Sequence, residues 1–142
     1  MKKISFVRQL AINITKTIGK REAAATAGTR SGTLDTRTRQ IMAKWLTEKG
    51  WCENLSLDET SEKLGLSKQK IALYTYSLYR MSFLRWRREL RIEEAKRLLL
   101  EDIKVPTALI GEYVGISDKS NFRRQFKEAT GYTPAEWRRL KH

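Results

Sequence analysis

Basic and hydrogen-bonding side chains are concentrated in residues 115–134, whose sequence is GISDKSNFRRQFKEATGYTP. If residues 118–129 form a helix, its rotation of about 100° per residue places Phe122, Phe126 and Ala129 on one face. The side chains broadly opposite that face are Ser120, Asn121, Arg124 and Lys127. We therefore predict that the two phenylalanines belong to a core and that the polar face binds a partner.

Two residues of that polar face have the chemistry that reads bases. The Arg124 guanidinium can bond to guanine O6 and N7 together, and the Asn121 carboxamide can pair with adenine N6 and N7. We predict base contact for Arg124, whereas for Asn121 a base contact and a contact to phosphate or water are equal alternatives. Lys119 and Arg123 lie on the flanks, where phosphate contact is favoured. The free backbone amides that begin at Ser117 form a seat for a phosphate.

The charge of the chain also indicates a polyanionic partner. Its 142 residues contain 29 Lys and Arg against 16 Asp and Glu, which gives a formal net charge of +13. Basic residues are spread along the chain instead of forming one tail, and such a positive field attracts nucleic acid. A chain of this length has room for one ordinary core or two small ones.

The sequence offers little for catalysis or metal binding. With Cys52 as its one cysteine and His142 as its one histidine, the chain has neither an internal disulfide nor a Cys/His metal cluster. It has no Gly-rich phosphate loop, and the neighbouring carboxylates at 93–94 and 101–102 do not converge as an acid/base pair. We predict a protein that is not an enzyme and uses no metal or cofactor.

The N-terminal part differs from the remainder. Polar residues interrupt positions 1–19, so we expect no secretory signal and a cytoplasmic protein without a membrane segment. An apolar stripe at helical spacing runs through Ile4, Val7, Ala11, Ile14 and Ile18. We favour a helix docked on the protein's own body, with self-association or a partner surface as the main alternative and a membrane-surface helix as the third. Residues 20–36 are rich in Ala, Thr, Gly and Ser and read as a linker.

Beyond Asp35 the sequence predicts an all-α fold of about seven helices, because no period-two alternation is sustained. Capping residues mark the starts: Ser56 in the capping box SLDE, Ser67, the pair Ser117 and Asp118, and Thr133 in the capping box TPAE. The expected helices cover about 36–49, 56–65, 68–79, 83–101, 106–115, 118–129 and 133 onward. A pair of Glu93 with Arg97 is expected to support the longest helix.

The chain contains one motif twice. Residues 64–67 match residues 114–117, and after a one-residue adjustment 81–88 match 132–139. Each copy reads as a helix, a glycine turn and a capped second helix, which is the helix-turn-helix arrangement. Hairpins that serve only as core are the alternative, but two copies in so basic a chain favour DNA. Trp86 and Trp137 occupy equivalent positions, so we predict that each fills the core of its own copy.

The segment between the copies has a length suited to DNA. A helix of about nineteen residues rises by nearly 30 Å. One turn of B-DNA is about 34 Å. We predict that one chain places two reading helices in successive major grooves.

The segments RIEEAKRLLLED and IGEYVGISDKSNFRRQFKEATGYTPAEWRR resemble the AraC/XylS family of bacterial transcription regulators. The resemblance covers about residues 36–141 and is most specific in its second half. It implies a DNA-binding domain with two helix-turn-helix units joined by a long helix, and a promoter-binding regulator, often an activator that also contacts RNA polymerase. Many members carry a separate ligand-sensing domain; because only some thirty-five mostly polar residues precede the matching part, we expect no small-molecule sensing by this chain.

The first copy departs from the family pattern at three positions. Leu73 stands where the family usually has Arg, Thr75 where it has Phe, and Arg80 where it has Gly. The residues of its second helix that we expect to point inward are Ile71, Tyr74, Thr75 and Leu78. Those that we predict at the DNA are Ser67, Lys68, Gln69, Lys70, Leu73 and Tyr76. Leu73 can offer only an apolar contact, such as one to a thymine methyl group, and a surface leucine without a role is the alternative.

These patterns predict an N-terminal segment (1–34) and a DNA-binding domain (35–142). The domain divides into a first helix-turn-helix (35–82), a linker helix (83–102) and a second helix-turn-helix (103–142). The predicted function is that of a sequence-specific, double-stranded DNA-binding transcription regulator whose second copy reads the major groove. Two alternatives stay open, namely a helical protein-interaction module on a degenerate scaffold of this type and a nonspecific nucleic-acid binder.

Overall fold

The computed structural model describes residues 34–141, so residues 1–33 and 142 lie outside the described part. The predicted apolar stripe at Ile4, Val7, Ala11, Ile14 and Ile18, and the self-association through it, fall outside the described residues. Within residues 34–141, no helix combines the length and the apolar character needed to cross a membrane.

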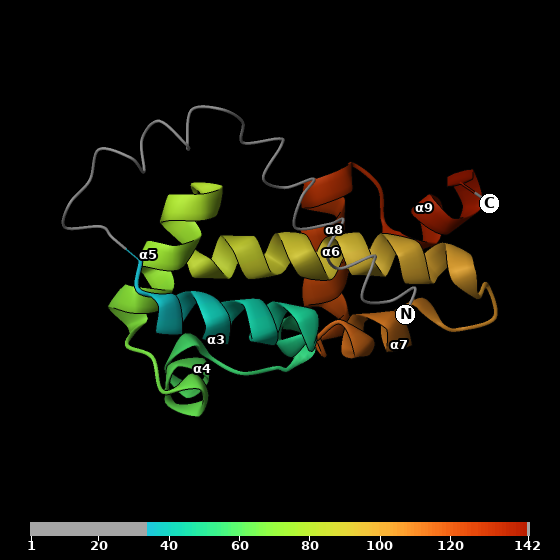
Figure 1. Ribbon diagram of the computed structural model, residues 1–142. Coiled ribbons are helices and arrows are strands. Elements are labelled where there is room, and N and C mark those ends of the chain that lie inside the picture. Colours follow the sequence, from blue (N-terminus) through green and yellow to red (C-terminus); the bar gives the residue numbers. More distant parts are fainter. Residues whose placement is uncertain (1–33, 142) are drawn as a thin grey trace. The chain divides into compact units, whose positions relative to one another are not determined.

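The described chain is all-helical, as predicted (Figure 1). Residues 34–141 form seven α-helices and one short 3-10 helix, and contain no strand. The elements are α3 (Thr36–Thr47), η2 (Gly50–Cys52), α4 (Leu57–Leu64), α5 (Lys68–Tyr79), α6 (Phe83–Glu101), α7 (Thr107–Tyr113), α8 (Lys119–Thr130) and α9 (Pro134–Lys141). The predicted long helix is confirmed by α6, whereas α3 ends before the predicted residue 49 because Lys49 has a positive φ of 58°.

Contacts divide the described residues into two compact units. The first unit contains the described residues through Gly50 together with Leu55–Arg87, and the second unit contains Trp51–Asn54 together with the described residues from Arg88 onward. α3, α4 and α5 therefore belong to the first unit, and α7, α8 and α9 to the second. Each unit has a core of its own.

An aromatic cluster fills the first unit. Trp86 is fully buried, as predicted, and its ring stacks on that of Tyr79 with 4.9 Å between the centroids. The Trp45 ring lies 5.6 Å from Trp86 and 5.4 Å from Phe83. Gly50 is required beside this cluster, because a Cβ there would lie 2.3 Å from the Trp45 indole. The cluster thus packs α3, α5 and the start of α6 together.

An apolar core joins α6, α7 and α8 in the second unit. Its buried members are Ile92, Ala95, Leu99, Ile110, Val114, Ile116, Phe122 and Phe126. Gly111 of α7 permits the packing, because a Cβ there would lie 2.8 Å from the Phe122 ring. Trp137 of α9 is half-buried, packs edge-on against Phe126 at 5.9 Å, and has the Lys96 amine over its ring. Both tryptophans thus pack in their own units as predicted, but Trp86 is fully buried whereas Trp137 is only half-buried.

A buried arginine fixes the segment Trp51–Asn54 within the second unit. Arg91, only 7% exposed, donates hydrogen bonds at 2.6 and 2.7 Å to the carbonyl oxygens of residues 51 and 53. A Cβ at Gly115, where φ is +93°, would lie 2.6 Å from another carbonyl oxygen of this segment. The Asn54 side-chain nitrogen lies 3.4 Å from Ser117 Oγ, so the segment reaches the residue before the cap of α8.

Two local expectations are wrong. Ala129, predicted on the core face of α8, is exposed, and the buried residues of that helix are Phe122 and Phe126. Glu93 pairs with Lys96 at 2.7 Å instead of with Arg97. The Arg97 guanidinium is bound to Glu94, whose side chain is buried, because a buried carboxylate needs a charged partner.

Candidate nucleic-acid interface

The exposed face of α8 carries most of the predicted contact residues. Asp118, instead of the predicted pair with Ser117, caps the helix, and its Oδ1 accepts the Asn121 N–H at 2.7 Å. The helix ends where Gly131 takes a φ of +85°. Phe122 and Phe126 are buried on the inner face, as predicted. The exposed candidates are Ser117, Lys119, Ser120, Arg123, Arg124 and Lys127, while Asn121 is half-buried.

Arg124 and Asn121, the two predicted base readers, are bonded to each other. A terminal nitrogen of Arg124 donates to Asn121 Oδ1, which also accepts from Gln125 Nε2 at 3.0 Å. The other terminal nitrogen of Arg124 lies 3.4 Å from Glu128 Oε1. The guanidinium is thus held along the outer face of the helix, and the Asn121 carbonyl is already occupied.

The remaining basic residues of α8 carry free charge. Lys119, Arg123 and Lys127 make no ion pair with any residue in the described part of the chain. Lys127 lies near the first turn of α9, where the Thr133 N–H holds the pKa of the Glu136 carboxyl below its ordinary value, with help from the Lys127 and Arg139 charges. The Thr133 N–H donates to the Glu136 carboxylate, and the Glu136 N–H donates to the Thr133 hydroxyl oxygen. These two hydrogen bonds form the predicted capping box of α9 and fix the carboxylate.

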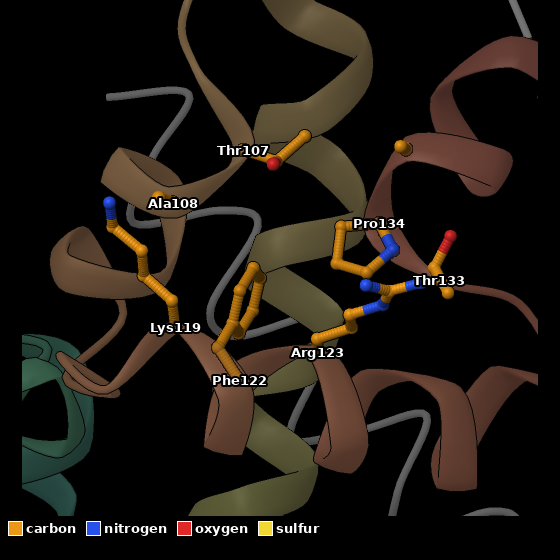
Figure 2. A pocket seen from close by; sticks show the side chains of 8 residues that line it. Thr107, Ala108, Lys119, Phe122, Arg123, Thr133 and Pro134 are labelled. Carbon is orange, nitrogen blue, oxygen red and sulfur yellow. The ribbon is translucent and has the colours of Figure 1, made fainter.

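A surface cavity of about 310 Å³ adjoins the same helix, as Figure 2 shows. Its lining includes Lys119, Phe122 and Arg123 of α8, Thr107 of α7, and Thr133 and Pro134 before and at the start of α9. Lys119 and Arg123 were predicted from the sequence as phosphate contacts, but Thr107 and Thr133 were not. No local signal gives those two threonines a contact role, because only the packing of three helices brings them beside α8; Thr133 was predicted only as the cap of α9.

The corresponding helix of the first unit is α5. Ser67 caps it as predicted, its Oγ accepting the Lys70 N–H at 3.2 Å, and the helix ends at Arg80 with a φ of +56°. Ile71, Tyr74 and Thr75 are buried and Leu78 is half-buried. Among the outward candidates, Ser67, Lys68, Gln69, Lys70 and Tyr76 are exposed, and Leu73 is half-buried.

Both lysines of α5 are paired with carboxylates of their own unit. The Lys68 amine lies 2.7 Å from the Asp58 carboxylate of α4. The Lys70 amine lies 3.4 Å from the carboxylate of Asp35, the cap of α3. The pKa of Asp35 is lowered mainly by the Thr38 N–H and further by the Lys70 charge. Sequence reasoning missed both pairs, because they join residues from different helices.

The caps give the residue correspondence between the two units. α5 and α8 each have 12 residues, begin after Ser67 and Asp118, and end before Arg80 and Gly131. The counterpart of Ser67 is therefore Asp118 and not Ser117, because the second unit has one extra residue between its glycine turn and its cap. On this correspondence Leu73 matches Arg124, Tyr76 matches Lys127, and Thr75 matches Phe126.

Comparisons with known proteins agree with this architecture. Residues 60–140 match the family described as helix-turn-helix domain, of the AraC type. The chain is 30% identical over 129 residues to the arabinose operon regulatory protein of Escherichia coli (strain K12), covering 91% of this chain but 44% of that relative. The chain thus spans less than half the length of that regulator.

Two solved structures are similar in fold. One is the C-terminal domain of AraT, a response regulator from Geobacillus stearothermophilus, with a TM-score of 0.64 and 27% identity, covering 79% of this chain and 88% of that one. The other is the C-terminal domain of the two-component response regulator yesN from Fusobacterium nucleatum, with a TM-score of 0.62 and 27% identity, covering 73% and 99%.

Proposed function

We propose, from the premise that this chain belongs to the AraC-type helix-turn-helix family, that it binds double-stranded DNA sequence-specifically and regulates transcription. Family membership supports the general role of a DNA-binding transcription regulator. The observation that carries the specific role is the outer face of α8, where Arg124 is held outward and three further basic side chains have no ion pair within residues 34–141. A helix with one buried face and one free basic face is suited to the major groove.

In this proposal Arg124 reads a guanine and its neighbours position the helix. The Arg124–Glu128 pair is exposed, so releasing it costs roughly 0.2–1 kcal/mol. A good bidentate contact to guanine contributes about 1–3 kcal/mol of discrimination. The exchange therefore favours the DNA. Asn121, whose carbonyl accepts from Arg124 and Gln125, acts mainly by orienting the guanidinium.

The first unit contributes a different kind of contact in the same proposal. At α5 the counterpart of Arg124 is Leu73, and Tyr76 beside it is 53% exposed. An apolar side chain can contact the methyl group of thymine. Gln69 and the paired Lys68 and Lys70, near the helix start capped by Ser67, would supply hydrogen bonds and phosphate contacts. At a promoter, the bound chain would act by recruiting or excluding RNA polymerase.

A second candidate function rests on the neutralised lysines of α5. Since Lys68 and Lys70 are paired within the first unit and Tyr76 and Leu84 are more than half exposed, α5 and its surroundings also suit a protein partner. In that case only the second unit would touch DNA. A DNA site with a single block of preferred bases would support this division.

The deciding experiment is selection of bound sequences from a random duplex pool, followed by titration of the winner at several salt concentrations. If about six to ten phosphates are neutralised, log affinity falls with log salt at a slope near −5 to −9. We expect that slope together with a clear preference for the selected sequence. The same slope on random DNA without any preference would mean a nonspecific binder, and a flat salt dependence would contradict the DNA-binding role.

A further inference from the structure

The cavity beside α8 has the chemistry of an anion site. Two cations, Lys119 and Arg123, line it, and no carboxylate belongs to the described residues that do so. In Figure 2 the Phe122 ring lies between these two side chains, with Lys119 beside Ala108 and Arg123 directed toward Pro134. The cavity therefore has an apolar floor with a positive charge at each side.

Neither of these two cations forms an ion pair within the described part of the chain. Lys119 and Arg123 stand four residues apart on one helix, where like charges repel each other. The carboxylates at the two neighbouring helix starts, Asp118 and Glu136, accept the Asn121 and Thr133 N–H groups at 2.7 and 2.9 Å, and neither forms an ion pair with Lys119 or Arg123. An external anion placed between the two cations would remove the repulsion and gain charge-assisted hydrogen bonds.

The size and position of the cavity indicate which anion. About 310 Å³ is at the lower end of the range for small-molecule sites, and it accommodates a phosphate with part of its sugar. Lys119 and Arg123 lie on the flank of α8 next to Ser120 and Arg124. When a helix occupies the major groove, the sugar-phosphate backbone runs along its flanks.

We propose that this cavity seats one backbone phosphate of bound DNA. Lys119 and Arg123 bind its two unbridged oxygens, the Thr107 hydroxyl adds a donor, and Phe122 and Pro134 contact the adjoining deoxyribose. The seat fixes the register of α8 in the groove, so that Arg124 meets one particular base pair. This inference rests on the proposed function, because it names the phosphate contact of the same DNA-binding face.

The test uses the full chain and the duplex selected from the random pool, with backbone phosphates replaced one at a time by uncharged methylphosphonate. With the wild-type protein, one position at the flank of the guanine read by Arg124 should lose about tenfold in affinity, the expected value of a charged hydrogen bond. In a Lys119→Gln/Arg123→Gln variant, the same replacement should change affinity less than about twofold, and the salt slope should become shallower by about 0.9.

A matched control removes the same charge elsewhere. Lys44→Gln/Lys104→Gln alters two exposed lysines that do not line the cavity, and it should keep the position-specific loss. Circular dichroism should show that both double variants fold, because all four side chains are exposed. If the cavity variant keeps the wild-type salt slope and the same methylphosphonate profile, the seat is wrong while sequence-specific binding stands.

A second experiment uses inorganic phosphate to distinguish a phosphate of the DNA backbone from a free phosphate ion as the ligand of the cavity. Titrated into the protein alone, it should shift the backbone amide signals around the cavity only weakly at millimolar concentration. If the wild-type chain shows no preferred duplex but binds inorganic phosphate tightly, and the cavity variant loses that binding, the site belongs to a free anion. That result would overturn both the backbone seat and the proposed function.

Discussion

α5 and α8 have the same length and the same cap positions, yet they differ in almost every outward side chain. The two lysines of α5 face carboxylates at 2.7 and 3.4 Å, whereas three basic residues of α8 have no ion pair within residues 34–141. Where α8 carries Arg124, α5 carries Leu73. One scaffold thus presents a charged surface in the second unit and a nearly neutral, partly apolar surface in the first.

The inner faces of the two helices differ as well. Thr75 takes the place that Phe126 has in the second unit, and its hydroxyl donates to the Ala72 carbonyl at 3.2 Å. The buried rings of the first unit belong instead to the aromatic cluster around Trp86, which includes Tyr74 and Tyr79. Buried rings therefore come from Phe122 and Phe126 in α8, and from Tyr74 and Tyr79, at other positions of the helix, in α5.

The largest expected effect concerns this difference in packing. Phe126→Ala should destabilise the second unit by about 3–5 kcal/mol, because it removes a fully buried ring and leaves a cavity. Thr75→Val, at the matching position of the first unit, should change stability by less than about 1 kcal/mol, since the lost hydrogen bond is compensated by an added methyl group. Urea denaturation checks both, and comparable losses would contradict the difference in packing between the two positions.

The fold and the starts of the helices were predictable because they depend on neighbours in sequence. The capping boxes at Ser56 and Thr133 each involve residues three apart, and both are confirmed. The family was predictable from the residues around the second glycine turn, and it too is confirmed. Such signals are local, so a single sequence contains all the information that they need.

The electrostatic state of the candidate site was not predictable in the same way. Lys70 and Asp35 are far apart in the chain and meet only after α3 and α5 have packed. From the sequence we therefore predicted Lys68 and Lys70 as DNA contacts, and their ion pairs with Asp58 and Asp35 could not be foreseen. The assignments of individual residues to bases or phosphates stay predictions, which the experiments on the two helices address.

The next effect compares the outward residues at one matched position. Arg124→Ala should weaken binding to the selected duplex by about 1–3 kcal/mol and relax the choice at one base position. Leu73→Ala should weaken binding by less than about 1 kcal/mol, because the only DNA contact that it removes is the proposed apolar contact to a thymine methyl group. Fluorescence anisotropy on selected and random duplexes measures both changes. Equal weakening on the two duplexes by Arg124→Ala would show that this arginine binds only phosphate.

Substitutions at the C-terminal ends of α5 and α8 should change stability by a smaller amount and in opposite directions. Arg80 and Gly131 both adopt positive φ, of 56° and 85°, which costs a residue with a side chain about 1–2 kcal/mol relative to glycine. Gly131→Ala should therefore destabilise by about 1 kcal/mol although its Cβ would meet no atom within 4 Å. Arg80→Gly should stabilise by up to about 1 kcal/mol, reduced by the loss of the contacts of the arginine. Thermal melts with the same sign for both changes would contradict the backbone explanation.

Removing a carboxylate from the first unit should make it more like the second. In Asp58→Asn, the Lys68 amine loses its partner at 2.7 Å and becomes available to a DNA phosphate. The salt slope of DNA binding should then steepen by about 0.9. Glu62→Gln is the matched control, because it removes one exposed negative charge of α4 that makes no ion pair within the described residues. An equal change in both variants would show that only net charge matters, and that α5 stays away from the DNA.

The smallest effect compares the two capping boxes under acid. The pKa of Glu59 is lowered by the Ser56 N–H and hydroxyl, and that of Glu136 by the same groups of Thr133. Since both folded-state pKa values lie below the ordinary 4.5, the stability that each carboxylate contributes is present above about pH 4.5 and is lost as pH falls through the lowered pKa. Glu59→Gln and Glu136→Gln should therefore each make Tm fall less steeply between about pH 5 and pH 3.

Salt should distinguish the two capping boxes. Because Lys127 and Arg139 also favour the Glu136 charge, Glu136→Gln should have the larger effect at low salt, and the difference should vanish at about 1 M salt. A difference that persists in high salt would mean that the hydrogen bonds of the two boxes, and not the neighbouring charges, distinguish the units.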